Sequence, residues 1–216
     1  MFKKIFIFLI SFLLTFITVI LAYLWDAPRN SDIIKPFFPK TLFSIENSPK
    51  DSLTGEVSSI SGNVAWQSRS SNYATLINSN IKLQQGEEVI THDNGKSVIS
   101  FSKVGTFTLF PNTQLSFIQT LPVNFVIEQD QGLATYDKTS DTKLSVRSLD
   151  LLININSGTS TISVDKDSAD IQVSVNSGSV SAAFNDTDNQ TNIITVEEGK
   201  KFIFNNNTKT GRIRNL

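Results

Sequence analysis

No combination of acid, base and nucleophile side chains stands out in this 216-residue chain. His92 is the single histidine and lies in the polar segment Thr91-His92-Asp93-Asn94. A serine hydrolase triad would have to use it, and one histidine cannot form a two-histidine metal site. No Gly-x-Ser-x-Gly sequence accompanies it. We therefore predict that His92 is a surface loop residue.

Adjacent carboxylates occur at Glu87-Glu88 and Glu197-Glu198. Neighbouring residues in a strand point to opposite faces, so only one member of each pair could face a shared cleft. We predict that both pairs are solvated turn residues. The acidic segment at 165–170 offers oxygen ligands but lacks the full loop and the distant glutamate of an EF-hand, so we predict a polar turn there.

Hydroxyl side chains recur on alternating positions of the presumed strands, as in Ser160, Ser163, Ser174 and Ser181. Such a face can bind carbohydrate, although it is also the ordinary solvent side of a strand. Because the chain has no cysteine, disulfides and thiolate metal sites are excluded. We predict no catalytic, cofactor-binding or metal-binding residues and a protein that is not an enzyme.

An uncharged apolar run covers residues 5–25, with Lys3 and Lys4 before it and Asp26 after it. As a helix, a run of this length spans the roughly 30 Å of a bilayer core. A cleaved signal peptide is the alternative, but the run is long for one and lacks a small-x-small cleavage site. We predict an uncleaved transmembrane helix, with residues 1–4 in the cytoplasm and the rest of the chain outside it.

Residues 26–53 contain Pro28, Pro36, Pro39 and Pro49 among polar residues, which predicts a semi-stiff stalk. Apolar residues between Ile33 and Phe43 could instead contact the bilayer or pack on the domain. Two of the 19 basic residues precede the apolar run, so the 20 acidic residues outnumber the basic ones beyond it. This balance does not attract nucleic acid.

A β domain is predicted from residue 54 to the end of the chain at 216. Between Leu83 and Phe117, short alternating apolar runs are separated by glycine or Asn-Gly, which is typical of strands. The turn at 93–95 predicts a hairpin that pairs Val89-Ile90 with the strand at 98–101. Trp66 is the expected large core residue of this end, and no convincing amphipathic helix follows the membrane segment.

The second half of the domain contains a quasi-repeat. Residues 155–164 align with residues 175–184 at an offset of 20, and each copy contains Asn-Ser-Gly. A recurrence near this length is typical of a small β-solenoid or β-roll whose coils stack. A β-sandwich with regular hairpins would produce similar spacing. The fold class is therefore all-β, with roll and sandwich both open.

Residues 54 to about 204 resemble an FecR domain. The matching features are short glycine-led strands, a central apolar segment and closing Val-x-x-Gly pieces. They are Gly55-x-Val57, Gly62-x-Val64, Leu83-x-x-Gly86-x-x-Val89-Ile90-Thr91, Val98 to Phe101, Gly105 to Leu109, Pro111-Asn112-Thr113-x-Leu115-x-Phe117, Gly132, Gly158-Thr159, Gly178-Ser179-Val180 and Val196-x-x-Gly199.

This resemblance implies an extracytoplasmic β domain that senses or transmits a signal. The best-known members of the family also carry a cytoplasmic anti-sigma segment, whereas many others are anchored or secreted domains with an expected role in binding at the cell envelope. Residues 1–4 are too short for the anti-sigma segment, so we do not expect that activity. We predict a single-pass membrane protein whose domain binds a protein or glycan ligand at the cell envelope. The alternatives are a structural envelope component that assembles through β edges and, third, a polysaccharide-processing enzyme.

Overall fold

The computed structural model describes residues 13–16, 18 and 48–216. Residues 13–16 and 18 are helical and belong to the predicted membrane segment 5–25. The remainder of that segment, the predicted stub 1–4 and residues 26–47 of the stalk lie outside the described residues. Among the described residues, no helix has the length and apolar character needed to span a bilayer. The folded domain belongs to the compact unit Ile45–Leu216.

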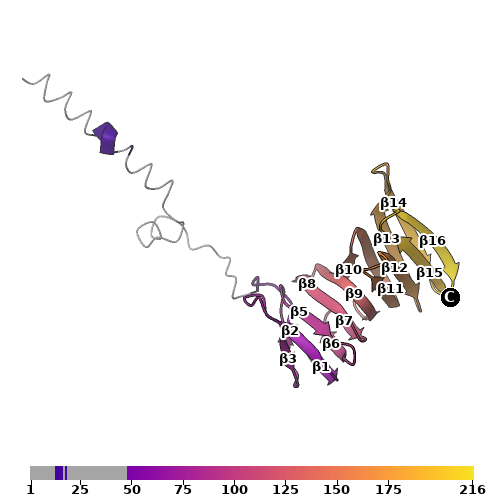
Figure 1. Ribbon diagram of the computed structural model, residues 1–216, viewed down its shortest axis with the longest axis horizontal. Coiled ribbons are helices and arrows are strands. Elements are labelled where there is room, and N and C mark those ends of the chain that lie inside the picture. Colours follow the sequence, from indigo (N-terminus) through magenta and orange to yellow (C-terminus); the bar gives the residue numbers. More distant parts are fainter. Residues whose placement is uncertain (1–12, 17, 19–47) are drawn as a thin grey trace, which may run out of the picture. The chain divides into compact units, whose positions relative to one another are not determined.

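Beyond residue 47 the described chain is all-β, as predicted (Figure 1). Its strands are β1 (Gly55–Ser61), β2 (Val64–Gln67), β3 (Thr75–Ile77), β4 (Lys82–Leu83), β5 (Glu88–Thr91), β6 (Lys96–Phe101), β7 (Gly105–Leu109), β8 (Gln114–Leu121), β9 (Asn124–Lys138), β10 (Lys143–Ser148), β11 (Leu151–Asp165), β12 (Asp170–Val175), β13 (Ser179–Asn185), β14 (Thr191–Glu197), β15 (Lys200–Asn205) and β16 (Thr210–Asn215).

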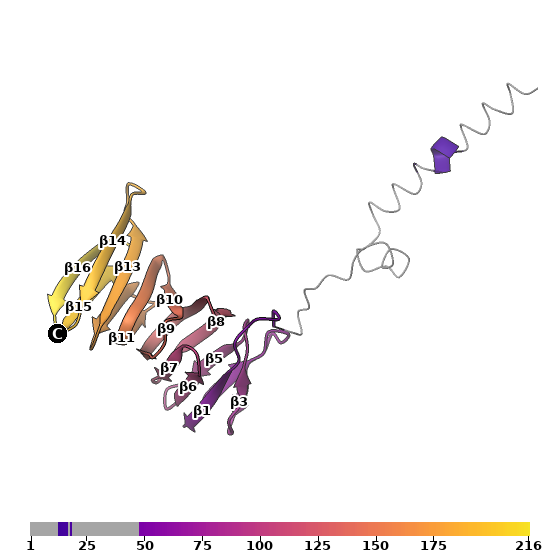
Figure 2. The same ribbon diagram turned by 180° about the vertical axis from the view of Figure 1, so that it is seen from behind.

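The strands form two layers that face each other across one core (Figures 1 and 2). The first layer runs β4-β1-β6-β7-β9-β11-β12-β15-β16. The second layer runs β3-β2-β5-β8-β9-β10-β11-β13-β14. Because β9 and β11 are long enough to belong to both layers, all strands join into one folded, unclosed sheet. The fold thus combines sandwich-like layering with the roll-like winding of the chain from one layer to the other.

Glycine marks the corners at which the chain changes layer. In β11 the corner is at Gly158, with φ +75°, and between β12 and β13 it is at Gly178, with φ +79°. The two corners lie against each other, since a Cβ on either glycine would be 2.3 Å from the carbonyl oxygen of the serine before the other. The quasi-repeat is therefore a pair of touching corners.

Strand β9 turns its corner at Gly132, and a buried glutamine satisfies the backbone that the corner exposes. Gln129 Nε2 donates to the carbonyl oxygens of Gly132 (2.9 Å) and Ile162 (3.2 Å). Gln129 Oε1 accepts a hydrogen bond from the hydroxyl of Tyr136 at 2.8 Å. Burial raises the pKa of Tyr136 well above its ordinary value, so the phenol stays protonated and donates.

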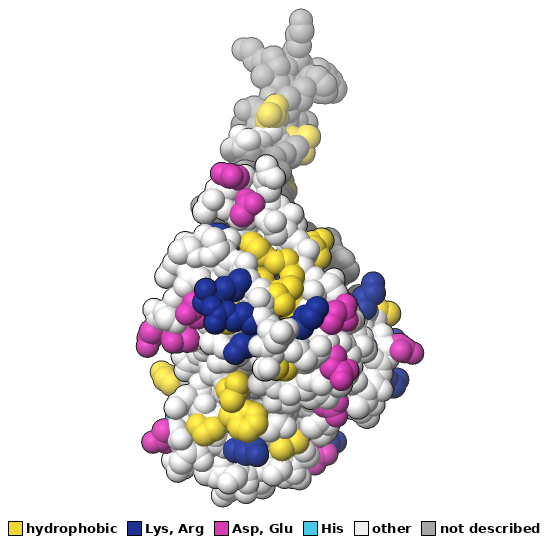
Figure 3. Space-filling model, turned by 90° about the vertical axis from the view of Figure 1, so that its right-hand side faces the viewer, with side chains coloured by type: hydrophobic (Ala, Val, Ile, Leu, Met, Phe, Trp, Pro, Cys, Tyr) yellow, Lys and Arg dark blue, Asp and Glu magenta, His cyan; other side chains and the backbone are white. Residues whose placement is uncertain are grey.

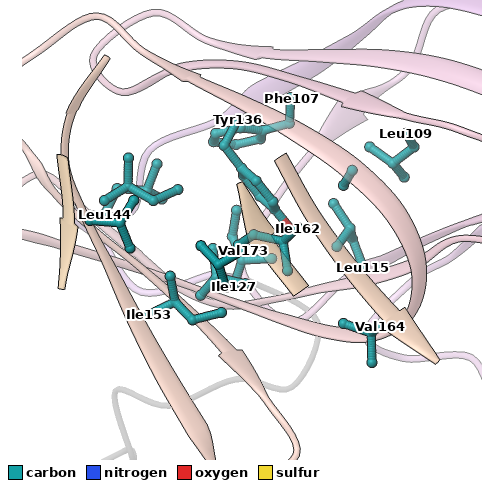
Figure 4. Packing of buried hydrophobic residues seen from close by; sticks show 14 of the residues in the cluster. Phe107, Leu109, Leu115, Ile127, Tyr136, Leu144, Ile153, Ile162, Val164 and Val173 are labelled. Carbon is teal, nitrogen blue, oxygen red and sulfur yellow. The ribbon is translucent and has the colours of Figure 1, made fainter. Parts of the chain in front are cut away.

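Aromatic side chains fill the core between β6, β7, β8 and β9. Phe125 is fully buried, and its ring centroid lies 4.7 Å from Phe101, 6.0 Å from Phe107 and 6.4 Å from Phe117. Figure 4 shows the adjoining part of the core, in which Phe107 packs on Tyr136 beside aliphatic side chains from both layers. Burying one such ring contributes about 1.5–3 kcal/mol.

The predicted hairpin at 93–95 is wrong. Strand β5 pairs with β2 and β8 in the second layer, whereas β6 pairs with β1 and β7 in the first. The turn is therefore another corner between the layers, and it packs closely, since a Cβ on Gly95 would lie 2.2 Å from the carbonyl oxygen of Asn63. Trp66 is only half-buried and packs at the margin of the core, so it is not the central residue expected.

Candidate binding surface

Three of the polar segments singled out in the sequence are surface features, as predicted. His92 is exposed in the corner between β5 and β6, and Glu197 and Glu198 are exposed at the end of β14. Asp165 Oδ1 accepts hydrogen bonds from the backbone N–H groups of Asp167 (3.0 Å) and Ser168 (3.2 Å), which makes 165–170 a polar turn. In the described part of the chain, no cluster of three or more acidic, histidine or cysteine side chains could hold a metal ion.

Glu87 contradicts the prediction of a solvated turn residue. It is only 8% exposed, and its Oε2 accepts hydrogen bonds from the backbone N–H of Gln84 (2.8 Å) and the indole of Trp66 (3.2 Å). Burial raises the pKa of the Glu87 carboxyl, although both hydrogen bonds and the nearby charge of Arg69 oppose the shift. Glu88 is half-buried, and burial raises its pKa as well. Glu87 therefore stabilises the turn that precedes β5.

This arrangement predicts how two substitutions at Glu87 differ. Glu87→Gln retains an oxygen acceptor and should change the free energy of unfolding at pH 7 by less than about 0.5 kcal/mol. Glu87→Ala leaves two donors without an acceptor and should destabilise the domain by about 1–3 kcal/mol. Urea unfolding of both variants measures the difference.

The pH dependence provides a second readout for Glu87. Since its pKa is higher in the folded than in the unfolded state, the folded domain binds the proton more tightly. Relative to Glu87→Gln, the wild-type free energy of unfolding should fall as the pH rises from the ordinary carboxyl pKa through the raised one. A relative stability that instead increases with pH would contradict this role.

The four serines named as examples of alternating polar positions do not all face solvent. Ser163 and Ser174 are half-exposed on the outer face of the first layer, and Ser181 is half-exposed on the second. Ser160 is fully buried, and its hydroxyl has no hydrogen-bond partner. The alternation of β11 changes phase at the Gly158 corner, so Ser160 points inward together with Ile162. Three of the four serines therefore lie on the solvent side of their strands, and Ser160 does not.

The C-terminal end of the domain, formed by β14, β15 and β16, presents free strand edges. Strand β14 pairs only with β13 and ends the second layer, and β16 pairs only with β15 and ends the first. A strand at a sheet edge presents unpaired backbone N–H and C=O groups. Every residue of β16 is exposed. This end can therefore accept further backbone hydrogen bonds.

Apolar side chains are exposed at the same end. Phe184, Phe202 and Phe204 close the core there, with Phe184 and Phe204 centroids 4.6 Å apart. Gly211 of β16 lies on the ring of Phe202, where an added Cβ would be 2.3 Å from the ring. Outside the part of the core that Gly211 covers, Ile213 of β16 is 44% exposed and Ile193 of β14 is 72% exposed. Figure 3 views this end and shows hydrophobic side chains at the surface beside a group of Lys and Arg side chains.

Cations lie on the outer face of this end. Arg214 pairs in register with Lys201, and Arg212 pairs with Ile203, so the three charges share one face of β15 and β16. The ion pairs between side chains in the described chain are Arg147–Glu128 and Lys209–Asp150, and none involves these three residues. Their charge remains available to a ligand.

The sequence interpretation overlooked this surface, although a signal was present. Arg212-Ile213-Arg214 alternates with period two and follows the turn-forming segment at 205–208, which together indicate a final hairpin. The resemblance to the FecR domain ended near residue 204, before this strand begins. The basic character of the strand is thus a property that the resemblance did not cover.

The fold is shared with solved structures. Two crystal structures, at 2.50 and 1.65 Å resolution, show a protein from Parabacteroides distasonis ATCC 8503 that carries the provisional designation of anti-sigma factor. Each has a TM-score of 0.52, with 14% and 13% sequence identity, and the match covers 59% of this chain and 59% of that one. At this identity the similarity establishes the fold alone. No model of a known protein family matches the chain, and no curated protein is significantly similar in sequence.

Proposed function

We propose that this protein is a membrane-anchored, extracytoplasmic FecR-like domain that binds a protein or glycan ligand at the cell envelope, for sensing or display. The uncharged run 5–25 supports the anchor, and the order of glycine-led strands supports the family. The fold shared with a protein provisionally designated an anti-sigma factor supports a regulatory rather than an enzymatic role.

One observation carries the binding function: the C-terminal end of the domain combines free strand edges, exposed apolar side chains and unpaired cations. In an isolated domain the edge N–H and C=O groups are unpaired, the apolar side chains are exposed to water and the cations have no ion-pair partner. A bound partner could supply hydrogen bonds, apolar cover and opposite charge. In this account the anchor fixes the domain outside the membrane, and its C-terminal end meets the ligand.

The free edges also support the alternative of a structural component that assembles laterally. Self-pairing of β14 would use an edge strand with apolar residues, including Ile193. A purified domain that forms filaments as its concentration rises would favour this alternative. A domain that stays monomeric over the same concentration range would favour the binding of an envelope ligand. Sedimentation over a hundredfold concentration range separates the two.

The proposed location can be tested because the chain contains no cysteine. Val123→Cys places a thiol on an exposed turn, since Val123 is 74% exposed. In cells whose outer barrier is opened but whose inner membrane is intact, a membrane-impermeant maleimide should label this variant. It should not label a Lys3→Cys control until the inner membrane is lysed. Labelling of the Val123→Cys variant only after lysis would contradict the proposal.

A further inference from the structure

Strand β16 has a free side whose backbone groups can be identified. The N–H of Leu216 donates to the carbonyl oxygen of Gly199 at 2.9 Å. In an antiparallel pair, every second residue directs its N–H and C=O groups toward the partner strand. Arg214 and Arg212 lie two and four residues before Leu216 in the β15–β16 register, so their backbone groups also point toward β15. The backbone groups of Gly211, Ile213 and Asn215 therefore point away from the sheet, where the described chain contains no strand to receive them.

The two faces of β16 differ in chemistry. Arg212 and Arg214 lie on the outer face beside Ile203 and Lys201, while Ile213 lies on the core side beside Phe202. A strand added to this edge would place its own side chains opposite those of β16. Acidic residues on its outer face would meet the arginines, and apolar residues on its inner face would cover Ile213.

Self-pairing of β16 is disfavoured by charge. Consider two copies of β16 that pair antiparallel through their free edges, with their apolar faces on the same side. An arginine of one copy would then lie opposite an arginine of the other. Like charges directly opposite one another destabilise a sheet. The edge is therefore selective against a second copy in this pairing, and its charge favours a partner of opposite sign.

We propose that β16 binds a partner protein by strand addition, and that the added strand alternates acidic with apolar residues. Main-chain hydrogen bonds would supply affinity, and the alternating side chains would supply specificity. This inference rests on the proposed function and specifies its ligand class as an acidic, extended protein segment.

The test uses the full chain in detergent micelles and a capped, fluorescent eight-residue peptide in which glutamate alternates with valine. One control peptide carries lysine in place of glutamate, and a second has the same composition with the glutamates contiguous. Fluorescence anisotropy should show binding of the alternating acidic peptide, with both controls at least about tenfold weaker. Equal binding of the two acidic peptides would overturn strand addition, because it would show attraction to negative charge alone.

Variants separate charge from backbone. The double variant Arg212→Glu and Arg214→Glu should bind the alternating acidic peptide roughly tenfold more weakly than the wild-type chain. Lys103→Glu, a charge change in the turn between β6 and β7, should leave this affinity unchanged.

The backbone contribution is tested at Ile213. Ile213→Pro removes an outward N–H without removing a bond to β15, so this variant should bind the alternating acidic peptide at least about fivefold more weakly than Ile213→Ala does. Equal affinity of the two Ile213 variants, with both folded by circular dichroism, would overturn the proposal. Absence of peptide binding while this end of the domain still cross-links to an envelope component would reject strand addition and leave the proposed function standing.

Discussion

Gly158→Ala should destabilise the domain by about 2–5 kcal/mol, measured by urea unfolding of the unit Ile45–Leu216. The residue has φ +75°, a left-handed conformation that costs a side-chain-bearing residue roughly 1–2 kcal/mol. The new Cβ would also lie 2.3 Å from the carbonyl oxygen of Ser177, so the two corners would have to separate. Overpacking of this kind costs about 1–3 kcal/mol.

Gly199→Ala is the matched control. Gly199 has nearly the same φ, +73°, but nothing lies within 4 Å of an added Cβ. This variant should lose only the conformational term of about 1–2 kcal/mol. Equal destabilisation of the two variants would show that the quasi-repeat corners accommodate the added Cβ without cost and would contradict their close packing.

Phe125→Ala should destabilise the domain by about 3–5 kcal/mol in the same assay. The side chain is fully buried among three other phenylalanine rings, and removing it leaves a cavity that the surrounding strands cannot close. Two residues earlier in the chain, Val123→Ala should change stability by less than about 0.5 kcal/mol, since Val123 is 74% exposed. A loss below about 1.5 kcal/mol for Phe125→Ala would contradict the position of the ring in the core.

The all-β class was predictable because apolar alternation and glycine spacing are local signals. Gly132, Gly158 and Gly178 were recognised as punctuation between strands, and all three are corners in the structure. The layer to which the chain continues after a corner was not predictable. At Gly95 the turn sequence suits a hairpin, yet β6 pairs with β1 and β7 in the other layer, and the turn packs on Asn63, which is distant in sequence.

Errors about individual side chains have the same origin. Glu87 is polar and precedes a strand, so its sequence context indicates a solvated turn. Its indole partner is 21 residues away, and only the fold brings them together. Grouping Ser160 with Ser163 on the solvent side is wrong, because the two have opposite parity along β11 and point to opposite faces of the strand. A register shift between Ile155 and Ser157 also precedes the change of layer.

The C-terminal end shows what a resemblance leaves out. The matched motifs end near residue 204, so only the residues of β15 and β16 themselves could indicate their hairpin, which the sequence interpretation overlooked. Arg212-Ile213-Arg214 is short and mostly polar, which weakens its strand signal. Its proposed role in binding rests on its being the last strand of a layer, and the order of strands in a layer cannot be derived from a local pattern.

Photo-cross-linking in living cells is the most direct test of the claim that the domain binds an envelope ligand through its C-terminal end. A photoreactive amino acid at position 213 probes β16, and the same group at position 133 is the control, because Ile213 and Leu133 are similarly exposed at 44% and 37%. We expect a discrete adduct with an envelope protein or glycan from position 213 and none from position 133. Adducts that form equally from both positions, or only with a cytoplasmic protein, would contradict the account.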